Sequence, residues 1–364
     1  MNFASSREGK DVGTRIGQGL GLARRLLLSE NFVLYISILY FLGLWIFIPR
    51  IASAGNLSNI SSNMWPLLTL AIGQMFVLIV GGIDLSQASI MGITSVVGGL
   101  VMTSRLDPTL FSKNILWGVI ISENGGLLGG SPAAVPVGIA AMLLAGVLIG
   151  MLNGIAVAKL RMPAFMVTLV SMMFFSGLAI YLTRSENIIN LPRIYTAIGQ
   201  EAFWRVPYSF FVAVALAAAA HIVLSRTLVG RWFYAVGQNV RASVISGVPA
   251  ARVTIYAYIF SGFCAAVGSV LYSARLEAGR PTLGQNLLLD IIGAVVIGGI
   301  SLYGGKGKVL WAVFGVLFFT LLSNSLNMLD LSFYTVDIVK GSIILLAALI
   351  DVVRTRLLAK GGAA

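Results

Sequence analysis

Six uncharged polar residues lie inside long apolar stretches of this sequence: Gln74, Asn153, Thr168, Ser171, Asn324 and Asn327. Amide and hydroxyl groups can exchange hydrogen bonds with the hydroxyls of a small polar solute. In apolar surroundings the same groups also bond between neighbouring helices. The residue types therefore indicate either a path for a polar solute or contacts between helices, and both roles stay open for each residue.

Few ionisable residues fall inside or beside the apolar stretches. Asp84 and Asp290 lie at the ends of two of them, and we add both to the candidate solute path. Asp337 and Lys340 share a third stretch at a spacing that puts both on one face of a helix. They are expected to neutralise each other near a helix end, or alternatively to relay protons.

The motifs of common catalytic and nucleotide sites are missing. The segment Gly304-Gly-Lys-Gly-Lys308 lacks the first glycine and the final Ser or Thr of a phosphate-binding loop. There is no H-E-x-x-H and no G-x-S-x-G with triad partners. With Cys264 and His221 as its one cysteine and one histidine, the chain is expected to hold no catalytic residue, metal or cofactor and not to be an enzyme.

The elements that carry these residues must be membrane helices. Hydrophobic residues make up 58% of the chain and charged residues only 10%, with a mean hydropathy of +0.93; a soluble domain has about 25% charged residues. A helix that crosses a bilayer needs about 20 apolar residues, which predicts an all-α polytopic membrane protein with about ten transmembrane helices. The predicted spans are 31–49, 63–81, 85–104, 133–157, 164–182, 207–224, 253–272, 287–302, 308–328 and 334–351.

The net charge of +12 fits basic loops held against a cytoplasmic membrane surface, and no run of basic residues suggests nucleic-acid binding. With the N-terminus inside, the inner connections hold about twice as many Lys and Arg as the outer ones, which predicts that both termini are cytoplasmic. We expect a basic tail at 1–30, a transmembrane domain at 31–351 and a cytoplasmic tail at 352–364. The first apolar run is too long for a signal peptide, and we expect it to be retained.

Three connections differ from the rest. The region 112–132 is the hardest to assign, because 115–122 could extend the fourth span, whereas 125–132 has the composition of a loop. The outer connection 183–206 is long and mixed in charge. The inner connection 225–252 is the inner loop long enough to carry a rigid lever.

From Gly81-Gly-Ile-Asp-Leu-Ser86 onward, the sequence resembles the ribose-type permeases of bacterial ABC sugar importers. The resemblance covers residues 60–351, and its motifs occur in order along the chain. Further matching stretches are Gly150–Gly154, Pro163–Leu169, Gly230–Gly237, Ser246–Val248, Asp290, Ala294–Gly299, Gly304–Gly307 and Asn324–Asn327.

This resemblance implies a type II importer fold in the bacterial inner membrane. It implies a second permease chain, identical or different, and a cytoplasmic ATPase that binds the ATP and Mg. It also implies a periplasmic binding protein that delivers a monosaccharide or related small polar solute and sets most of the specificity. The sugar itself is not implied.

The inner connection 225–252 would then couple the permease to the ATPase. The run Arg241-Ala-Ser-Val-Ile-Ser-Gly247 predicts a short helix that ends near the glycine. It is similar to the E-A-A-x-x-x-G pattern of importer permeases, except that Arg241 replaces Glu; the alternative is a basic loop lying on lipid. The expected coupling residues are Gly230, Arg231, Arg241, Ala242, Ser243 and Gly247.

Two competing functions remain at this stage. An ion-coupled secondary transporter of a small polar solute would work without an ATPase, but it usually holds more acidic groups within its spans. A channel or membrane enzyme would need a filter or a catalytic cluster, and the sequence contains neither.

Overall fold

The computed structural model describes Ser29 and residues 31–361, with side chains up to Leu349, and it is mostly helical. The predicted N-terminal tail therefore lies outside the described residues, apart from Ser29. The side chains of the predicted C-terminal tail also lie outside them, although the backbone of the last helix continues to Gly361.

Each predicted span overlaps one long or medium-length helix. These helices are α2 (Phe32–Phe47), α3 (Ala54–Ile79), α4 (Gln87–Met102), α6 (Ala134–Ala158), α7 (Ala164–Thr183), α9 (Tyr208–Arg226), α12 (Ala250–Arg275), α13 (Leu288–Ile297), α14 (Val309–Met328) and α15 (Phe333–Gly361).

The remaining elements make up the connections between these helices. They are η1 (Pro49–Ala52), α5 (Pro108–Phe111), α8 (Arg193–Gln200), β1 (Ala202–Phe203), β2 (Val206–Pro207), α10 (Leu228–Gln238), α11 (Val240–Ile245) and η2 (Gln285–Leu287). The two strands pair antiparallel in a single small hairpin.

In the described part of the chain, 6 helices are long and apolar enough to cross a membrane: α3, α6, α7, α9, α12 and α14. The apolar helices α2 and α4 have 16 residues each, which is about 24 Å at the usual helical rise. The chain is therefore a multi-pass membrane protein by helix length and composition.

The predicted span 287–302 is wrong at its C-terminal end. Helix α13 has only 10 residues and stops at Gly298, and an irregular segment follows as far as Lys308. A helix of that length is about 15 Å long, half of a bilayer core, so α13 alone is too short to cross. Apolar residues such as Ile300 continue past the helix end, which is why the hydropathy pattern overestimated its length.

Helix α3 begins nine residues earlier than its predicted span, at Ala54 rather than residue 63. The hydroxyl of Ser53 caps it by accepting a hydrogen bond from the Asn56 amide at 3.3 Å. The first turns of α3 are too polar for the hydropathy pattern to include them in a span, yet they carry Asn56 and Asn59, which line a cleft.

The region 112–132 contains turns and isolated bridges and no helix. The fourth span therefore does not extend back to residue 115, and the loop predicted at 125–132 is confirmed.

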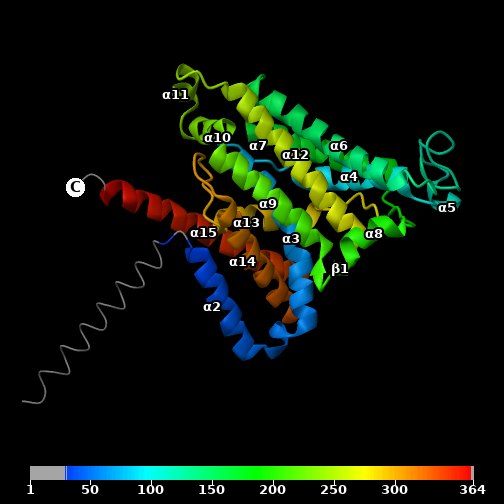
Figure 1. Cartoon of the computed structure of the whole chain (residues 1–364), viewed down its shortest axis with the longest axis horizontal. Coiled ribbons are helices and arrows are strands. Elements are labelled where there is room, and N and C mark those ends of the chain that lie inside the picture. The colour runs from blue at the N-terminus through cyan, green and yellow to red at the C-terminus, as the bar shows by residue number, and fades with distance from the viewer. Residues whose placement is uncertain (1–28, 30, 362–364) are drawn as a thin grey trace, which may run out of the picture.

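Helix α3 is the central element of the fold. Figure 1 shows α4, α6, α7 and α12 on one side of it and α2, α14 and α15 on the other. It contacts both α12 and α14, and its second half is buried from Leu67 onward. A shift of α3 would therefore reach both groups of helices.

Candidate functional site

The structure divides the predicted path residues into two groups. Gln74, Asp84, Asn153 and Thr168 gather around the link between α3 and α4. Asp290, Asn324 and Asn327 line a cleft near the other end of α3. Ser171 joins neither group through a bond, because its buried hydroxyl has no hydrogen-bond partner among the described residues.

The first group, which we call the Asp84 cluster, centres on a carboxylate with 0% exposure. One carboxylate oxygen accepts from the Ser86 amide at 2.9 Å and the Ser86 hydroxyl at 2.5 Å. The other accepts from the Ser261 hydroxyl at 2.7 Å. Hydrogen bonds to a charged group are the stronger ones, so this carboxylate holds the α3–α4 link firmly to α12.

Two amides complete the Asp84 cluster. The Asn153 side chain of α6 donates to the Ser86 hydroxyl at 2.8 Å, and the Gln87 side chain donates to the Ser261 hydroxyl at 2.8 Å. Each serine hydroxyl thus donates to Asp84 and accepts from an amide. The cluster ties α4, α6 and α12 together.

The backbone beside Asp84 is held in the same way. When its amide is oriented to suit its neighbours, Gln74 donates to the Asp84 carbonyl at 3.0 Å and accepts from the Asp84 amide at 3.3 Å. The Thr168 hydroxyl donates to the carbonyls of Ala164 at 3.0 Å and Ile83 at 3.3 Å. The Gln74 and Thr168 side chains are therefore already hydrogen-bonded to backbone groups of the protein.

The second group faces a cleft of about 360 Å³ between α3, α12, α13, α14 and α15, which we call the outward cleft. On the predicted orientation it lies toward the outer ends of these helices. Its lining residues are Asn56, Asn59, Asn63, Leu67, Tyr272, Leu287, Asp290, Thr320, Ser323, Asn324, Asn327, Met328 and Lys340.

Two polar stripes form the walls of the outward cleft. Helix α14 contributes Thr320, Ser323, Asn324 and Asn327, whose spacing puts them on one face. Helix α3 contributes a matching stripe of asparagines. The stripe residues that the sequence analysis did not select are Asn56, Asn59, Asn63, Thr320 and Ser323. The helical spacing of Asn56, Asn59 and Asn63 after the Ser53 cap could have identified the α3 residues, and the spacing of Thr320 and Ser323 with Asn324 and Asn327 could have identified those of α14.

The two stripes touch at one point. The side chains of Asn56 and Asn324 form a reciprocal amide pair, with nitrogen-to-oxygen distances of 3.0 and 2.9 Å. Deeper in the α3 stripe, Arg275 donates to Asn63 at 2.6 Å and to Asn59 at 3.1 Å.

The ion pair of the outward cleft corrects one prediction. Lys340 does not pair with Asp337 on its own helix; its Nζ lies 2.7 Å from the Asp290 carboxylate on α13. Side chains one turn apart on a helix compete with partners on neighbouring helices, and here the neighbour lies closer. The pair fastens α15 to α13 and contributes opposite charges to the wall of the cleft.

Two hydroxyls of the cleft have no hydrogen-bond partner within the described residues: Thr320 Oγ1 and Ser323 Oγ. Thr320 is only 5% exposed. A buried hydroxyl without a partner costs free energy, so these two groups contrast with the satisfied hydroxyls of the Asp84 cluster.

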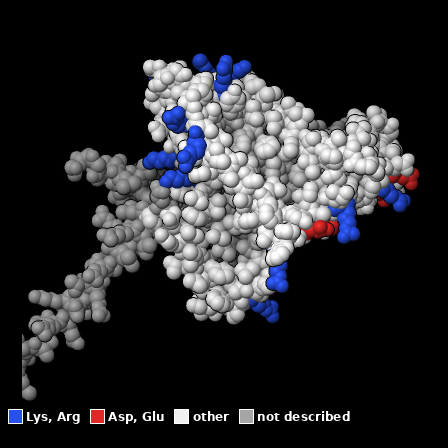
Figure 2. Space-filling view, in the orientation of Figure 1, with Lys and Arg blue, Asp and Glu red and all other residues white. Residues whose placement is uncertain are grey.

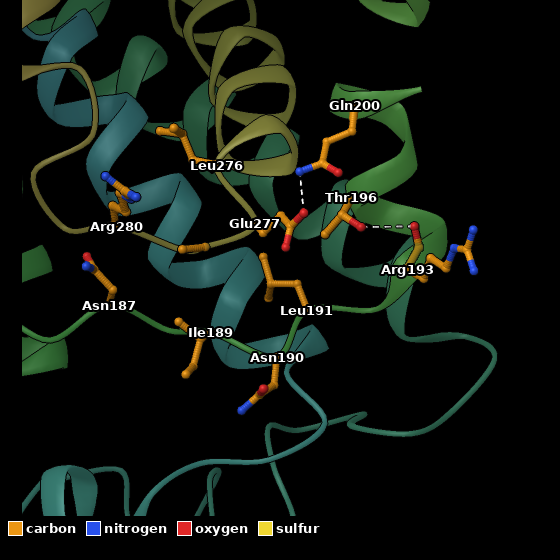
Figure 3. Close-up of a pocket in the computed structure, with 11 residues that line it drawn as sticks. Asn187, Ile189, Asn190, Leu191, Arg193, Thr196, Gln200, Leu276, Glu277 and Arg280 are labelled. Atoms are coloured by element: carbon orange, nitrogen blue, oxygen red, sulfur yellow. Dashed lines mark hydrogen bonds between the residues drawn. The ribbon is translucent and has the colours of Figure 1, made fainter. Parts of the chain in front are cut away.

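A larger basin of about 710 Å³ lies at the outer connections and contains none of the predicted path residues. Figure 3 shows it between the 187–200 segment and the chain that follows α12, with Arg193, Glu277 and Arg280 on its walls and Gln200 bonded to Glu277. Helix α8 is anchored beneath the basin by Tyr195, which shares a 2.6 Å hydrogen bond with Ser273. Burial raises the pKa of the Tyr195 phenol, which keeps it protonated.

The inner connection 225–252 folds into α10 and α11. Figure 2 shows Lys and Arg gathered at this end of the molecule, whereas the acidic side chains in view lie toward the other end. Helix α11 presents Val240, Val244 and Ile245 outward, and Ile245 is 88% exposed. An exposed apolar knob among basic residues is typical of a contact surface.

The short helix predicted at Arg241–Gly247 is confirmed, beginning one residue earlier, at Val240. Gly247 has φ +82°, and its amide bonds to the Val244 carbonyl while the Val248 amide bonds to that of Ser243. This pattern of bonds is the Schellman motif, which favours glycine at the left-handed position. Of the predicted coupling residues, Arg231, Arg241, Ala242 and Gly247 are exposed, whereas Gly230 and Ser243 are buried.

Helix α10 is locked to the inner end of α3. A Cβ on Gly237 would lie 1.8 Å from the Ile79 carbonyl oxygen and 2.5 Å from the Gly305 nitrogen. Gly305 itself donates to the Ile79 carbonyl at 2.8 Å, and the Tyr234 hydroxyl donates to the Gly307 carbonyl at 2.7 Å. Through this glycine junction, α10 contacts α3 and the loop that joins α13 to α14.

Comparison with known proteins gives one family match. Residues 56–348 match the family model described as branched-chain amino acid transport system / permease component. No solved structure matches the chain.

Among curated proteins, the ribose import permease protein RbsC of Bacillus subtilis is 32% identical over 320 residues, which covers 85% of this chain and 91% of the relative. RbsC of Haemophilus influenzae is 31% identical, covering 83% of this chain and 87% of the relative. The L-arabinose transport system permease protein AraH of Escherichia coli is 28% identical, covering 85% and 87%.

Proposed function

Because this chain belongs to the family of branched-chain amino acid transport system permease components, we propose that it is the membrane permease of an ABC importer for a monosaccharide or related small polar solute. It is a transport subunit and not an enzyme. ATP and Mg would be bound by a separate cytoplasmic ATPase. The solute would arrive on a periplasmic binding protein.

One observation carries the choice of a sugar over a branched-chain amino acid. The outward cleft is lined mainly by amides and hydroxyls, whereas a branched aliphatic side chain would need an apolar wall. The named sugar permeases among the relatives, for ribose and L-arabinose, agree with this chemistry.

In this proposal, the solute path runs through the outward cleft, past Asp290, Asn324 and Asn327. The Asp84 cluster, with Gln74, Asn153 and Thr168, is the fixed anchor around which the path opens. The anchoring role of the Asp84 cluster is supported by the hydrogen bonds that its polar side chains make to one another and to the backbone.

The proposed topology has ten membrane-embedded helices, both termini in the cytoplasm and the 31–351 region as one transmembrane domain. Helix α13 would enter the bilayer only halfway. The basic inner end in Figure 2 supports this orientation. A second permease chain, identical or related, would complete the pore.

The coupling surface is α11 with the exposed face of α10. The ATPase would grip Arg231, Arg241, Ala242 and the apolar knob around Ile245. Movement of α10 would pass through the glycine junction to α3 and to the loop between α13 and α14. Helices α3, α13 and α14 all form walls of the outward cleft.

The experiment that tests this function replaces Gly247 by Pro. Proline fixes φ near −65° and removes the amide that bonds to Val244, so the Schellman motif cannot form. We expect normal insertion in the membrane, loss of ATPase stimulation by the sugar-loaded binding protein, and loss of uptake. Normal stimulation and uptake in this variant would overturn the coupling assignment.

A matched pair of surface variants controls for general damage to the inner face. Ile245→Ser removes the apolar knob of α11, whereas Leu160→Ser changes a residue that is 67% exposed in the inner connection between α6 and α7. Co-purification with the ATPase should fall for the first variant and stay normal for the second. Equal effects would mean that α11 is not the docking surface.

A further inference from the structure

We propose that the outward cleft is a binding site for a neutral polyhydroxylated ligand of monosaccharide size, held between the asparagine stripe of α3 and the hydroxyl and amide stripe of α14. This inference rests on the proposed function and deepens it, because a transport path need not contain a site at which the solute rests.

The two walls of the cleft carry the chemistry that a sugar needs. The α3 stripe offers Asn56, and the α14 stripe offers Ser323 and Asn327 among others. Asn59 and Asn63 also line the cleft, although they already bond to each other and to Arg275. Each amide supplies donors and an acceptor, and each hydroxyl supplies both. A sugar presents donors and acceptors of the same kind around its ring, so both walls can bond to it at once.

Two buried hydroxyls of the cleft, Thr320 Oγ1 and Ser323 Oγ, have no hydrogen-bond partner among the described residues. If these side chains only packed against their neighbours, the protein would be more stable with an apolar side chain at each position. Both groups line the same cavity, and a ligand hydroxyl placed there would supply the missing hydrogen bonds.

The size and charge of the cleft fit a small neutral ligand. The cleft volume of about 360 Å³ lies at the lower end of the range for small-molecule pockets, about 300–1,000 Å³. The charges of Asp290 and Lys340 are paired across 2.7 Å. The Arg275 guanidinium bonds to Asn59 and Asn63. These charged groups already have partners, so the site favours a neutral ligand.

The reciprocal pair of Asn56 and Asn324 is the point at which the walls meet. The hydroxyls of a ligand can replace both hydrogen bonds between the two side-chain amides with equivalent ones. The pair can therefore separate at little cost in free energy when a sugar enters. An apolar ligand would leave both amides without partners.

Protection of an introduced cysteine tests the site. Cys264, the chain's one natural cysteine, is buried with 0% exposure, so we expect little background labelling of the wild-type chain. In Ser323→Cys, a small methanethiosulfonate reagent should label the cleft. Millimolar D-ribose, D-xylose or L-arabinose should slow labelling, because a sugar bound in the pocket covers the introduced thiol.

The matched control is Ser112→Cys, an exposed serine just after α5. Figure 1 shows α5 at the right-hand end of the molecule, away from α14. Its labelling should not change with sugar. The inference is overturned if none of the three sugars protects Ser323→Cys, if L-leucine protects it equally, or if Ser112→Cys is protected to the same extent.

A second variant needs no labelling. Thr320→Val removes a hydroxyl that has no hydrogen-bond partner among the described residues, so the unfolding temperature of the importer should stay the same or rise. If a sugar uses that hydroxyl, KM for uptake should rise about 2- to 10-fold. An unchanged KM would contradict the assignment of Thr320 to the site.

These results separate the site from the proposed function. ATP-driven uptake by the wild type with no sugar protection would reject the site and leave the importer assignment standing. Sugar protection in a chain that shows no ATP-driven uptake would reject the importer and leave the site standing.

Discussion

The Asp84 cluster and the outward cleft contain the same kinds of polar residue but differ in what those residues bond to. In the cluster, the Asp84 carboxylate and the Ser86 and Ser261 hydroxyls are all hydrogen-bonded and fully buried, and among the cluster's described buried side-chain atoms only the Gln87 amide oxygen lacks a partner. In the cleft, the hydroxyls of Thr320 and Ser323 have no partner in the described protein, and a cavity remains between the walls.

This difference separates two uses of polarity in an apolar chain. Satisfied polar groups fasten helices together and resist movement. Unsatisfied groups around a cavity destabilise the empty protein and favour a ligand. Helix α3 joins the two regions, since Gln74 lies beside the cluster and Asn56 lies in the cleft.

The largest expected effect comes from Asp84→Ala. This change leaves the Ser86 and Ser261 hydroxyls and the Ser86 amide without their buried acceptor, and it should lower the free energy of unfolding by about 3 kcal/mol or more. Asp84→Asn keeps an acceptor oxygen and should lose less. Thermal unfolding and the yield of purified protein measure both variants. An Ala variant as stable as the wild type, but inactive, would make the cluster a functional site instead.

Breaking the ion pair of the cleft should have the next largest effect. Lys340→Met leaves the Asp290 carboxylate without its cation and should cost about 2–4 kcal/mol. Adding Asp290→Asn removes the stranded charge, so the double variant should recover much of that loss. If thermal unfolding shows that the two single losses simply add, the pair is not coupled as the 2.7 Å distance indicates.

The glycine junction should respond to a single methyl group. Gly237→Ala places a Cβ where only 1.8 Å separates it from the Ile79 carbonyl, and overpacking of this kind costs about 1–3 kcal/mol. Uptake should fall because α10 can no longer rest on α3. Gly177→Ala is the matched control, because a Cβ there meets nothing within 4 Å. Equal uptake by the two variants would argue against the junction.

The smallest effects compare one asparagine from each region. Asn153→Ala should destabilise the protein by about 1–2 kcal/mol, because the Ser86 hydroxyl keeps its bond to Asp84 but loses the buried amide that donates to it. Asn327→Ala should change stability by less than about 0.5 kcal/mol but should slow uptake. Stability and uptake that change in parallel for both variants would remove the distinction between cluster and cleft.

Local pattern was enough to predict several parts of this structure. Apolar length located every described helix of 16 residues or more, and Gly247 located the end of α11, which lies two residues before it. These features depend on residues close together in sequence. A helix end with a left-handed glycine is set by its own backbone bonds.

Features that depend on distant residues were predicted poorly. Lys340 pairs with Asp290, which is 50 residues away in sequence, and not with Asp337 on the same helix. The division of the polar candidates into cluster and cleft also follows from helix packing, as with the 67-residue separation of Ser86 and Asn153. The early start of α3 was missed because its first turns are polar, and hydropathy cannot distinguish a polar loop from a polar helix that lines a cleft.

The most direct test of the central claim is uptake of labelled pentose by proteoliposomes that contain this chain with its ATPase and binding protein. We expect uptake that requires ATP on the ATPase side and sugar-loaded binding protein on the other, and that continues when ion gradients are collapsed. Uptake by this chain alone, driven by a proton or sodium gradient and indifferent to ATP, would contradict the importer assignment and establish the ion-coupled carrier in its place.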